Sequence, residues 1–83
     1  MHIGPYQRDI MEQLRCTAEE AQIVETIMRE NIFHSTLDWQ TKKEFQSGAR
    51  KAWKLFLSKR EFFESHHRNM KALFHEMKKA HAG

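Results

Sequence analysis

An apolar stripe that keeps helical register from Phe45 to Met77 is the feature that most constrains the fold of this chain. At about 100° per residue, its members lie within roughly 40° of the Phe45 direction, as one face of an α-helix requires. They are Phe45, Ala49, Ala52, Phe56, Phe63, Met70, Phe74 and Met77, and His81 continues in phase with them. The pattern predicts a long C-terminal helix over about residues 42–82.

Residues 58–61 decide whether this helix is continuous. Ser58-Lys-Arg-Glu61 matches a capping box, which would start a fresh helix after a corner at Leu57. However, no proline or glycine near Ser58 enforces a break, and the register passes through without correction. We therefore expect one continuous helix, roughly 60 Å long at about 1.5 Å per residue, with a break near Ser58 as the alternative.

Two shorter helices are predicted in the N-terminal half. Pro5 suits the first position of a helix, and the apolar residues that follow it at a spacing of four predict a helix over residues 5–15. Thr17-Ala-Glu-Glu20 fits a capping box, and it precedes apolar residues on one side of a helix over residues 18–30. Thr41-Lys-Lys-Glu44 fits a second capping box at the start of the long helix.

Residues 31–40 are expected to form a compact, partly buried connection with a short helical turn. Polar residues that compete for backbone groups cluster there, with Ser35 and Asp38 placed for a one-turn cap. The same stretch is too apolar for a flexible tether. Trp39 within it, and Trp53 at the flank of the stripe, are interpreted first as core side chains.

The composition agrees with a small all-α bundle of three or four helices. The 83 residues are 40% hydrophobic with three Gly and one Pro, which predicts a single helical domain over residues 1–83. One cysteine, Cys16, excludes an intrachain disulfide framework, and no apolar run is long enough for a membrane span. We therefore expect a cytoplasmic protein that does not act at a membrane.

We expect part of the apolar stripe on the long helix to stay exposed to solvent. The two short helices offer only about 36 Å of helix to cover a stripe of about 60 Å. Exposed stripes of this kind usually mark a partner surface, and a two-fold dimer is the simplest way to bury one. The expected partner-binding residues are Phe62, Phe63, His66, Met70, Phe74 and Met77. A non-enzymatic interaction protein, docking on itself as a homodimer or on another protein, is the favoured function.

Charge is divided unevenly along the chain and suggests an alternative function. The first 41 residues carry three cations and seven anions, whereas residues 42–83 carry eleven cations and four anions. On the helix that starts near Lys42, a basic ridge lies opposite the apolar stripe and could follow a phosphate backbone. It consists of Lys43, Arg50, Lys51 and Lys54. A small dimeric nucleic-acid-binding protein is therefore the second hypothesis.

The sequence gives little evidence for a catalytic site or a metal site. The six histidines include no pair at the i, i+3 or i, i+4 spacing that a helical metal site needs. One Glu-x-x-His motif occurs, Glu64-Ser-His-His67. A metal or redox site at Glu64, His66 and His67 is therefore the weakest hypothesis. Cys16 precedes a helix start that could lower a thiol pKa, but a packing role is favoured. We expect no enzyme activity, cofactor, metal or small-molecule substrate.

Overall fold

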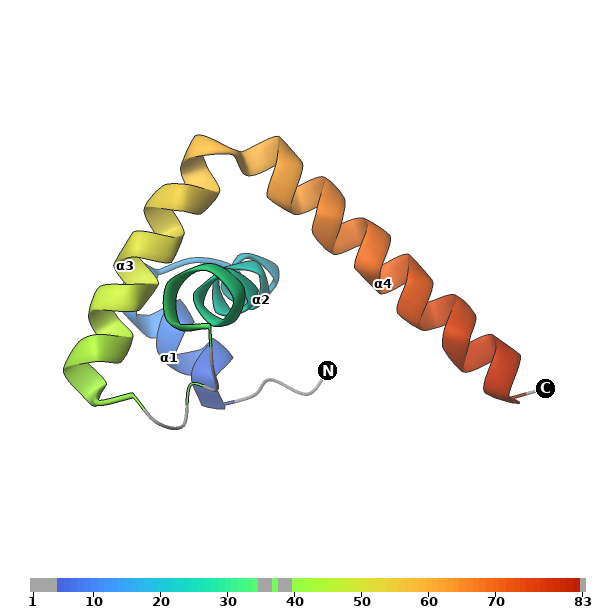
Figure 1. The fold of residues 1–83 in the computed structure, drawn as a ribbon, viewed down its shortest axis with the longest axis horizontal. Coiled ribbons are helices and arrows are strands. Elements are labelled where there is room, and N and C mark those ends of the chain that lie inside the picture. The colour runs from blue at the N-terminus through green and yellow to red at the C-terminus, as the bar shows by residue number, and fades with distance from the viewer. Residues whose placement is uncertain (1–4, 35–36, 38–39, 83) are drawn as a thin grey trace.

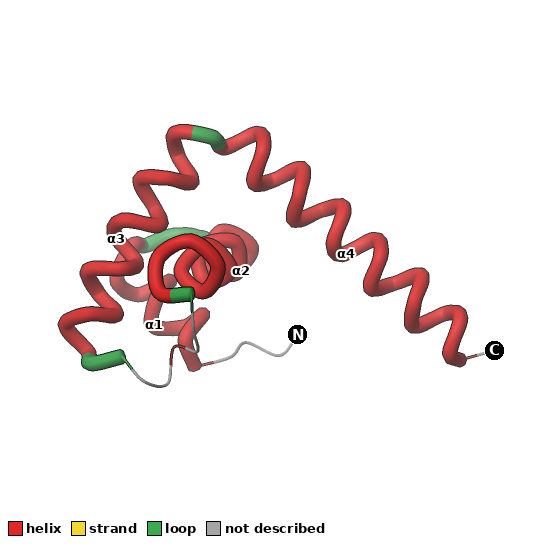
Figure 2. Tube along the Cα trace, viewed as in Figure 1, coloured by secondary structure: helices red, strands yellow, loops and turns green. Residues whose placement is uncertain are grey.

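The chain folds into helices joined by short connections, as a computed structural model shows (Figures 1 and 2). The structure describes residues 5–34, 37 and 40–82, and only the backbone of residues 5 and 79–82. The helices are α1 (Pro5–Leu14), α2 (Ala18–Ile27), η1 (Met28–Phe33), α3 (Lys42–Ser58) and α4 (Arg60–Ala82). No strand occurs among these residues, so the prediction of a small all-α bundle is confirmed.

Two helices begin at the positions that the capping patterns in the sequence predicted. The Thr17 side chain accepts a hydrogen bond from the Glu20 N–H at 3.1 Å, and the Glu20 carboxylate accepts one from the Thr17 N–H at 2.9 Å. This reciprocal pair satisfies two backbone donors that the first turn of α2 would otherwise leave unpaired. At the start of α3, the Thr41 side chain accepts from the Glu44 N–H at 3.2 Å.

The prediction that residues 31–40 form a connection is wrong for its first three residues. Helix α2 runs directly into η1, a π-helical segment that continues to Phe33 and ends at His34 in the left-handed conformation, with φ 55°. Ile32 and Phe33 pack against the core beside α3, which favours extending the helix to reach them. Leu37 is buried, as expected of a compact connection. Ser35, Asp38 and Trp39 lie outside the described residues.

The core lies where α1, α2, η1 and α3 meet. Phe56 of α3, Ile10 of α1 and Ile27 of α2 are its largest fully buried side chains, and Met28 extends it into η1. On α3 the predicted stripe is buried at Phe45, Ala49, Ala52 and Phe56. Trp53 is partly buried with its ring 5.5 Å from that of Phe56, in agreement with a core role.

The expectation of one continuous long helix is wrong, because the helix breaks at Lys59. This residue leaves the helical region, with φ −134° and ψ 46°, and its N–H bonds to both Leu55 and Phe56 carbonyls at 3.2 Å. The Ser58 hydroxyl donates to the Leu55 carbonyl at 2.7 Å, so the last turn of α3 closes on itself. Helix α4 restarts when the Phe63 N–H bonds to the Lys59 carbonyl at 3.1 Å.

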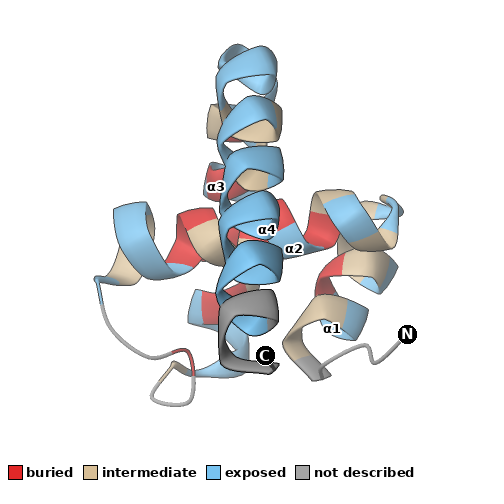
Figure 3. Ribbon diagram, turned by 90° about the vertical axis from the view of Figure 1, so that its right-hand side faces the viewer, coloured by how far each residue is buried: buried red, intermediate tan, exposed pale blue. Residues whose placement is uncertain are grey.

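The corner turns α4 back towards α2 and then past the body of the molecule (Figure 1). Phe63, near its start, is partly buried against the core, but every described side chain from Arg68 to Lys78 is exposed (Figure 3). The radius of gyration is 13.6 Å, against about 12 Å for a compact domain of this length. Most of α4 is thus held only through its first turns.

Candidate functional site

A groove of about 720 Å³ lies between α4 on one side and α2 with η1 on the other. We call it the α2–α4 groove. Its α4 wall carries Phe62, Met70 and Phe74, while Gln22 and Glu30 contribute polar groups to the opposite wall. The corner at Lys59 creates the groove, since a straight helix would have carried this apolar face away from α2.

The apolar face of α4 is exposed, as the sequence predicts. Its exposed fractions are 63% for Phe62, 43% for Met70, 53% for Leu73, 67% for Phe74 and 58% for Met77. Of the other expected partner-binding residues, His66 is exposed, whereas Phe63 is partly buried against the core. Leu73 was missed because it lies about 80° from the Phe45 direction. Its spacing from Met70 and Met77 is the signal that would have included it.

Aromatic rings gather at the start of α4. The Phe62 and Phe63 ring centroids lie 5.3 Å apart at 77°, an edge-to-face arrangement. The His66 ring stacks on Phe62 at 6.3 Å and 5°. Because Phe63 is anchored in the core, these contacts help to fix the orientation of Phe62 and His66 at the end of the groove near the corner.

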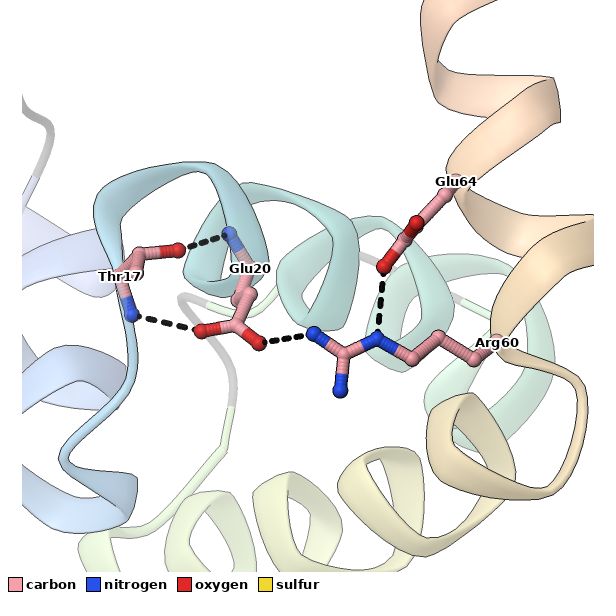
Figure 4. A network of polar contacts seen from close by, with 4 residues as sticks. All are labelled: Thr17, Glu20, Arg60 and Glu64. Atoms are coloured by element: carbon pink, nitrogen blue, oxygen red, sulfur yellow. Dashed lines mark hydrogen bonds and ion pairs between the residues drawn. The ribbon is translucent and has the colours of Figure 1, made fainter.

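One arginine ties α4 to α2 (Figure 4). The Arg60 guanidinium donates to Glu20 at 2.8 Å and to Glu64 at 2.7 Å, and it lies 5.3 Å from the centre of the Phe56 ring. The pKa of Glu20 is below its ordinary value, mainly because its carboxylate accepts from the Thr17 N–H, with Arg60 acting in the same direction. The N-terminal cap of α2 is therefore also an attachment point for α4.

His67 faces α2 from the second turn of α4. Its Nε2 atom is buried, has no hydrogen-bond partner among the described residues, and lies 4.0 Å from a Glu19 carboxylate oxygen. Burial lowers the pKa of His67, and Lys71 and His66 add to this effect, although Glu19 opposes it. The environment of His67 thus favours the neutral imidazole.

The residues of the weakest hypothesis do not converge on a metal site. Glu64 is engaged by Arg60, His66 stacks on Phe62, and His67 faces Glu19. Within the described part of the chain, no three His, Cys, Asp or Glu side chains are placed to hold a metal ion. Burial raises the pKa of the Cys16 thiol, with the Glu20 carboxylate acting in the same direction, contrary to the lowering considered from the sequence.

The basic ridge occupies the solvent-facing side of α3. Lys43, Arg50, Lys51 and Lys54 are all exposed, whereas the stripe on the opposite side of this helix is buried. None of the four forms an ion pair with another residue that the structure describes. The ridge and the α2–α4 groove share no residue.

Comparison with known protein families, curated proteins and solved structures found no match. Of the helices that the structure describes, none combines the length and the apolar character needed to cross a membrane.

Proposed function

We propose that this protein is a non-enzymatic helical interaction protein that docks on a protein surface through the apolar face of α4. The docked protein is either a second copy of the chain or another polypeptide. The observation that supports this proposal is the line of large apolar side chains, 43–67% exposed, along a helix that leaves the core after its first turns. Contiguous apolar patches on monomeric proteins are usually interaction sites.

The apolar face of α4 is exposed because of where it lies relative to the core. The apolar face of α4 continues the register of the buried stripe of α3, but the core covers only the α3 part and Phe63. Burying apolar side chains is worth about 25 cal/mol for each Å² removed from water. A partner that covers the face would gain this free energy without unfolding any part of the core.

A capture experiment with matched baits tests the proposal. Phe74→Glu places a charge in the centre of the face, whereas Ala72→Glu places the same charge about 160° away on the same helix. We expect at least one polypeptide to be retained by the wild-type and Ala72→Glu baits and lost with Phe74→Glu. If no polypeptide, including an untagged copy of the chain, shows this pattern, the proposal is wrong.

A cytoplasmic location and the absence of catalysis belong to the same proposal. A single thiol gives no disulfide framework of the kind found in secreted small domains. The Cys16 pKa is raised, which disfavours the thiolate that a nucleophile requires. Fractionation of cells that produce the protein tests the location, and recovery in a membrane or extracellular fraction would contradict it.

Nucleic-acid binding through the basic ridge is the second candidate function. Four exposed cations on one side of α3, without ion-pair partners among the described residues, favour it. Each phosphate contact releases counterions, so neutralising Lys43, Arg50 and Lys54 should flatten the logarithmic salt dependence of duplex binding by about one unit per lost contact. Failure of the wild type to bind duplex DNA or RNA at low salt would exclude this function.

A further inference from the structure

We infer that the partner docked on α4 is a second copy of this chain, and that a two-fold axis places α4 of each copy in the α2–α4 groove of the other. This inference rests on the proposed function, since it names the occupant of the same surface. A two-fold interface uses the same patch on both copies, so the patch must be complementary to itself. The groove and α4 meet this requirement in apolar area and in charge.

The apolar area matches one interface of ordinary size. The face consists of Phe62, Met70, Leu73, Phe74 and Met77, which are between 43% and 67% exposed. With about 200 Å² for a large apolar side chain, they offer on the order of 500 Å² per copy. A standard interface buries about 800 Å² per partner, of which roughly 60% is apolar. The two quantities agree.

The charges beside the face are complementary to the opposite wall of the groove. Lys71 and Lys78 lie on one flank of the apolar face of α4, where they line the groove, are exposed, and form no ion pair among the described residues. The α2 and η1 side carries Glu19 and Glu30, both exposed. Glu30 lines the groove, and Glu19 has only the 4.0 Å approach to His67. A second α4 in the groove would bring its cations to these carboxylates.

Charge also argues against pairing through α4 alone. When two helices pack antiparallel about a two-fold axis, the same flank of each helix meets its counterpart. The flank with Lys71 and Lys78 would then face itself, and like charges at close range are unfavourable. A placement in which the basic flank of each α4 faces the α2 and η1 wall of the other copy brings Lys71 and Lys78 to Glu30 instead.

Sedimentation equilibrium of the purified full chain, from about 1 to 300 µM, tests the inference. We expect wild type and Ala72→Glu to reach twice the chain mass of 10.0 kDa. Phe74→Glu should raise the dimer dissociation constant at least about 100-fold, the effect of losing a central apolar anchor. Circular dichroism checks that each variant keeps its helix content, and the exposure of Phe74 makes loss of folding unexpected.

A charge exchange tests the arrangement. One chain carries Lys71→Glu with Lys78→Glu, and a second carries Glu19→Lys with Glu30→Lys. Each variant alone should dimerise at least tenfold more weakly than wild type, because its α4 and its groove then have like charge. An equimolar mixture should form a heterodimer of near wild-type affinity, because α4 and groove charges are then opposite in both contacts.

The outcomes separate this inference from the proposed function. A wild-type chain that stays monomeric at 300 µM overturns the second-copy inference. The proposed function then still stands if the capture experiment finds another polypeptide that is lost with Phe74→Glu, and it fails if none is found. A dimer that is unaffected by Phe74→Glu overturns the second-copy inference, and the capture experiment again decides the proposed function. Full dimerisation of the Glu19→Lys, Glu30→Lys chain alone overturns the arrangement.

Discussion

Gly48 shows how closely two elements approach at the scale of single residues. A β-carbon on this buried α3 residue would overlap the Phe33 ring, while the Ile32 side chain would be in ordinary contact at 3.5 Å. The glycine therefore provides space for the end of η1, rather than an unusual backbone conformation. Without this space, the aromatic ring that closes the π-helical segment could not pack against α3.

The contact between Gly48 and Phe33 predicts that Gly48→Ala has opposite effects on the free energy of unfolding in the wild type and in a Phe33→Ala background. Gly48→Ala should destabilise the wild type by about 1 kcal/mol, because overpacking of about 1–3 kcal/mol outweighs a gain in helix propensity of about 1 kcal/mol. In a Phe33→Ala background, the same change should stabilise by about 1 kcal/mol, since only the propensity term remains. Urea denaturation measures both effects. Equal effects in the two backgrounds would mean that Phe33 and Gly48 are not coupled.

His67 gives a second prediction, on pH dependence. Its pKa is lowered by burial from the ordinary value of 6.5, so below that pH the unfolded chain takes up a proton more readily than the folded one. Stability should be highest above about pH 6.5 and should fall as the pH decreases towards the lower pKa of His67. Denaturation of wild type and His67→Gln between pH 7.5 and about pH 5 measures this effect.

In this test the His67→Gln variant should lose part of the dependence on pH. His75→Gln, at an exposed position of the same helix, is the matched control. Because Glu20 has a lowered pKa, it contributes stability that is lost at more acidic pH, as its carboxylate becomes protonated. The two groups therefore act in different pH ranges. An unchanged slope in His67→Gln would show that His67 does not titrate with unfolding.

At the scale of elements, the cap of α2 has two roles. Thr17 pairs with Glu20 across the first turn, and the same carboxylate accepts from Arg60 of α4. A single turn of helix therefore combines the start of α2 with the attachment of a helix more than forty positions along the chain. Loosening the cap should affect both the stability of α2 and the position of α4.

Thr17→Ala should destabilise the protein by about 1 kcal/mol, the usual cost of losing an N-cap side chain. Thr26→Ala is the matched control within α2, because the Thr26 hydroxyl donates to the Gln22 carbonyl without capping any helix end. The control should cost less than about 0.5 kcal/mol, since alanine is the better helix former. Denaturant midpoints compare the two variants, and equal losses would contradict a capping role for Thr17.

Capping and periodicity made the helices predictable from the sequence. Both rely on interactions within a few residues, so the starts of α2 and α3 and the buried stripe of α3 were placed correctly. The break at Lys59 was predicted only as the alternative, from the capping pattern at Ser58, because helical register records rotation about an axis and carries no information on a bend. The extension through η1 depends on packing against Gly48, a contact between residues distant in sequence.

The candidate site was predictable in part for the same reason. An apolar face longer than its cover follows from the sequence, and the exposed Phe62, Met70, Phe74 and Met77 agree with it. The second wall of the groove does not follow, because it exists only once the corner brings α4 beside α2. The burial of Phe63 has the same origin.

At the scale of the whole molecule, two parts differ in how they are stabilised. The α1–α3 body has a continuous core, whereas the distal part of α4 contributes no buried side chain among the described residues. If a second copy docks on α4 as proposed, association between chains and stability of the folded chain are coupled, because docking buries side chains of α4 that one chain leaves exposed. A second copy would add to the native state the apolar burial that one chain alone does not provide.

This coupling predicts a melting temperature that depends on protein concentration. A partner that binds only the folded chain shifts unfolding by mass action. With an unfolding enthalpy of about 0.7 kcal/mol per residue, the Tm of a dimer of this size should rise by about 4 °C for each tenfold increase in concentration. Calorimetry of wild type and Ala72→Glu should show the rise, and Phe74→Glu should not. A constant wild-type Tm would argue against dimerisation coupled to folding.

Because the helix is interrupted at Lys59, a small rotation at this residue moves the far end of α4 by a large distance. A helix of 23 residues is about 35 Å long, so a rotation of about 10° at this single residue would displace the far end by about 6 Å. The Arg60 contact to Glu20 of α2 lies one residue from this point of rotation. A change in the Arg60–Glu20 contact that rotates α4 would therefore displace Phe74 and Met77 several times farther than Arg60, and would change the width of the α2–α4 groove.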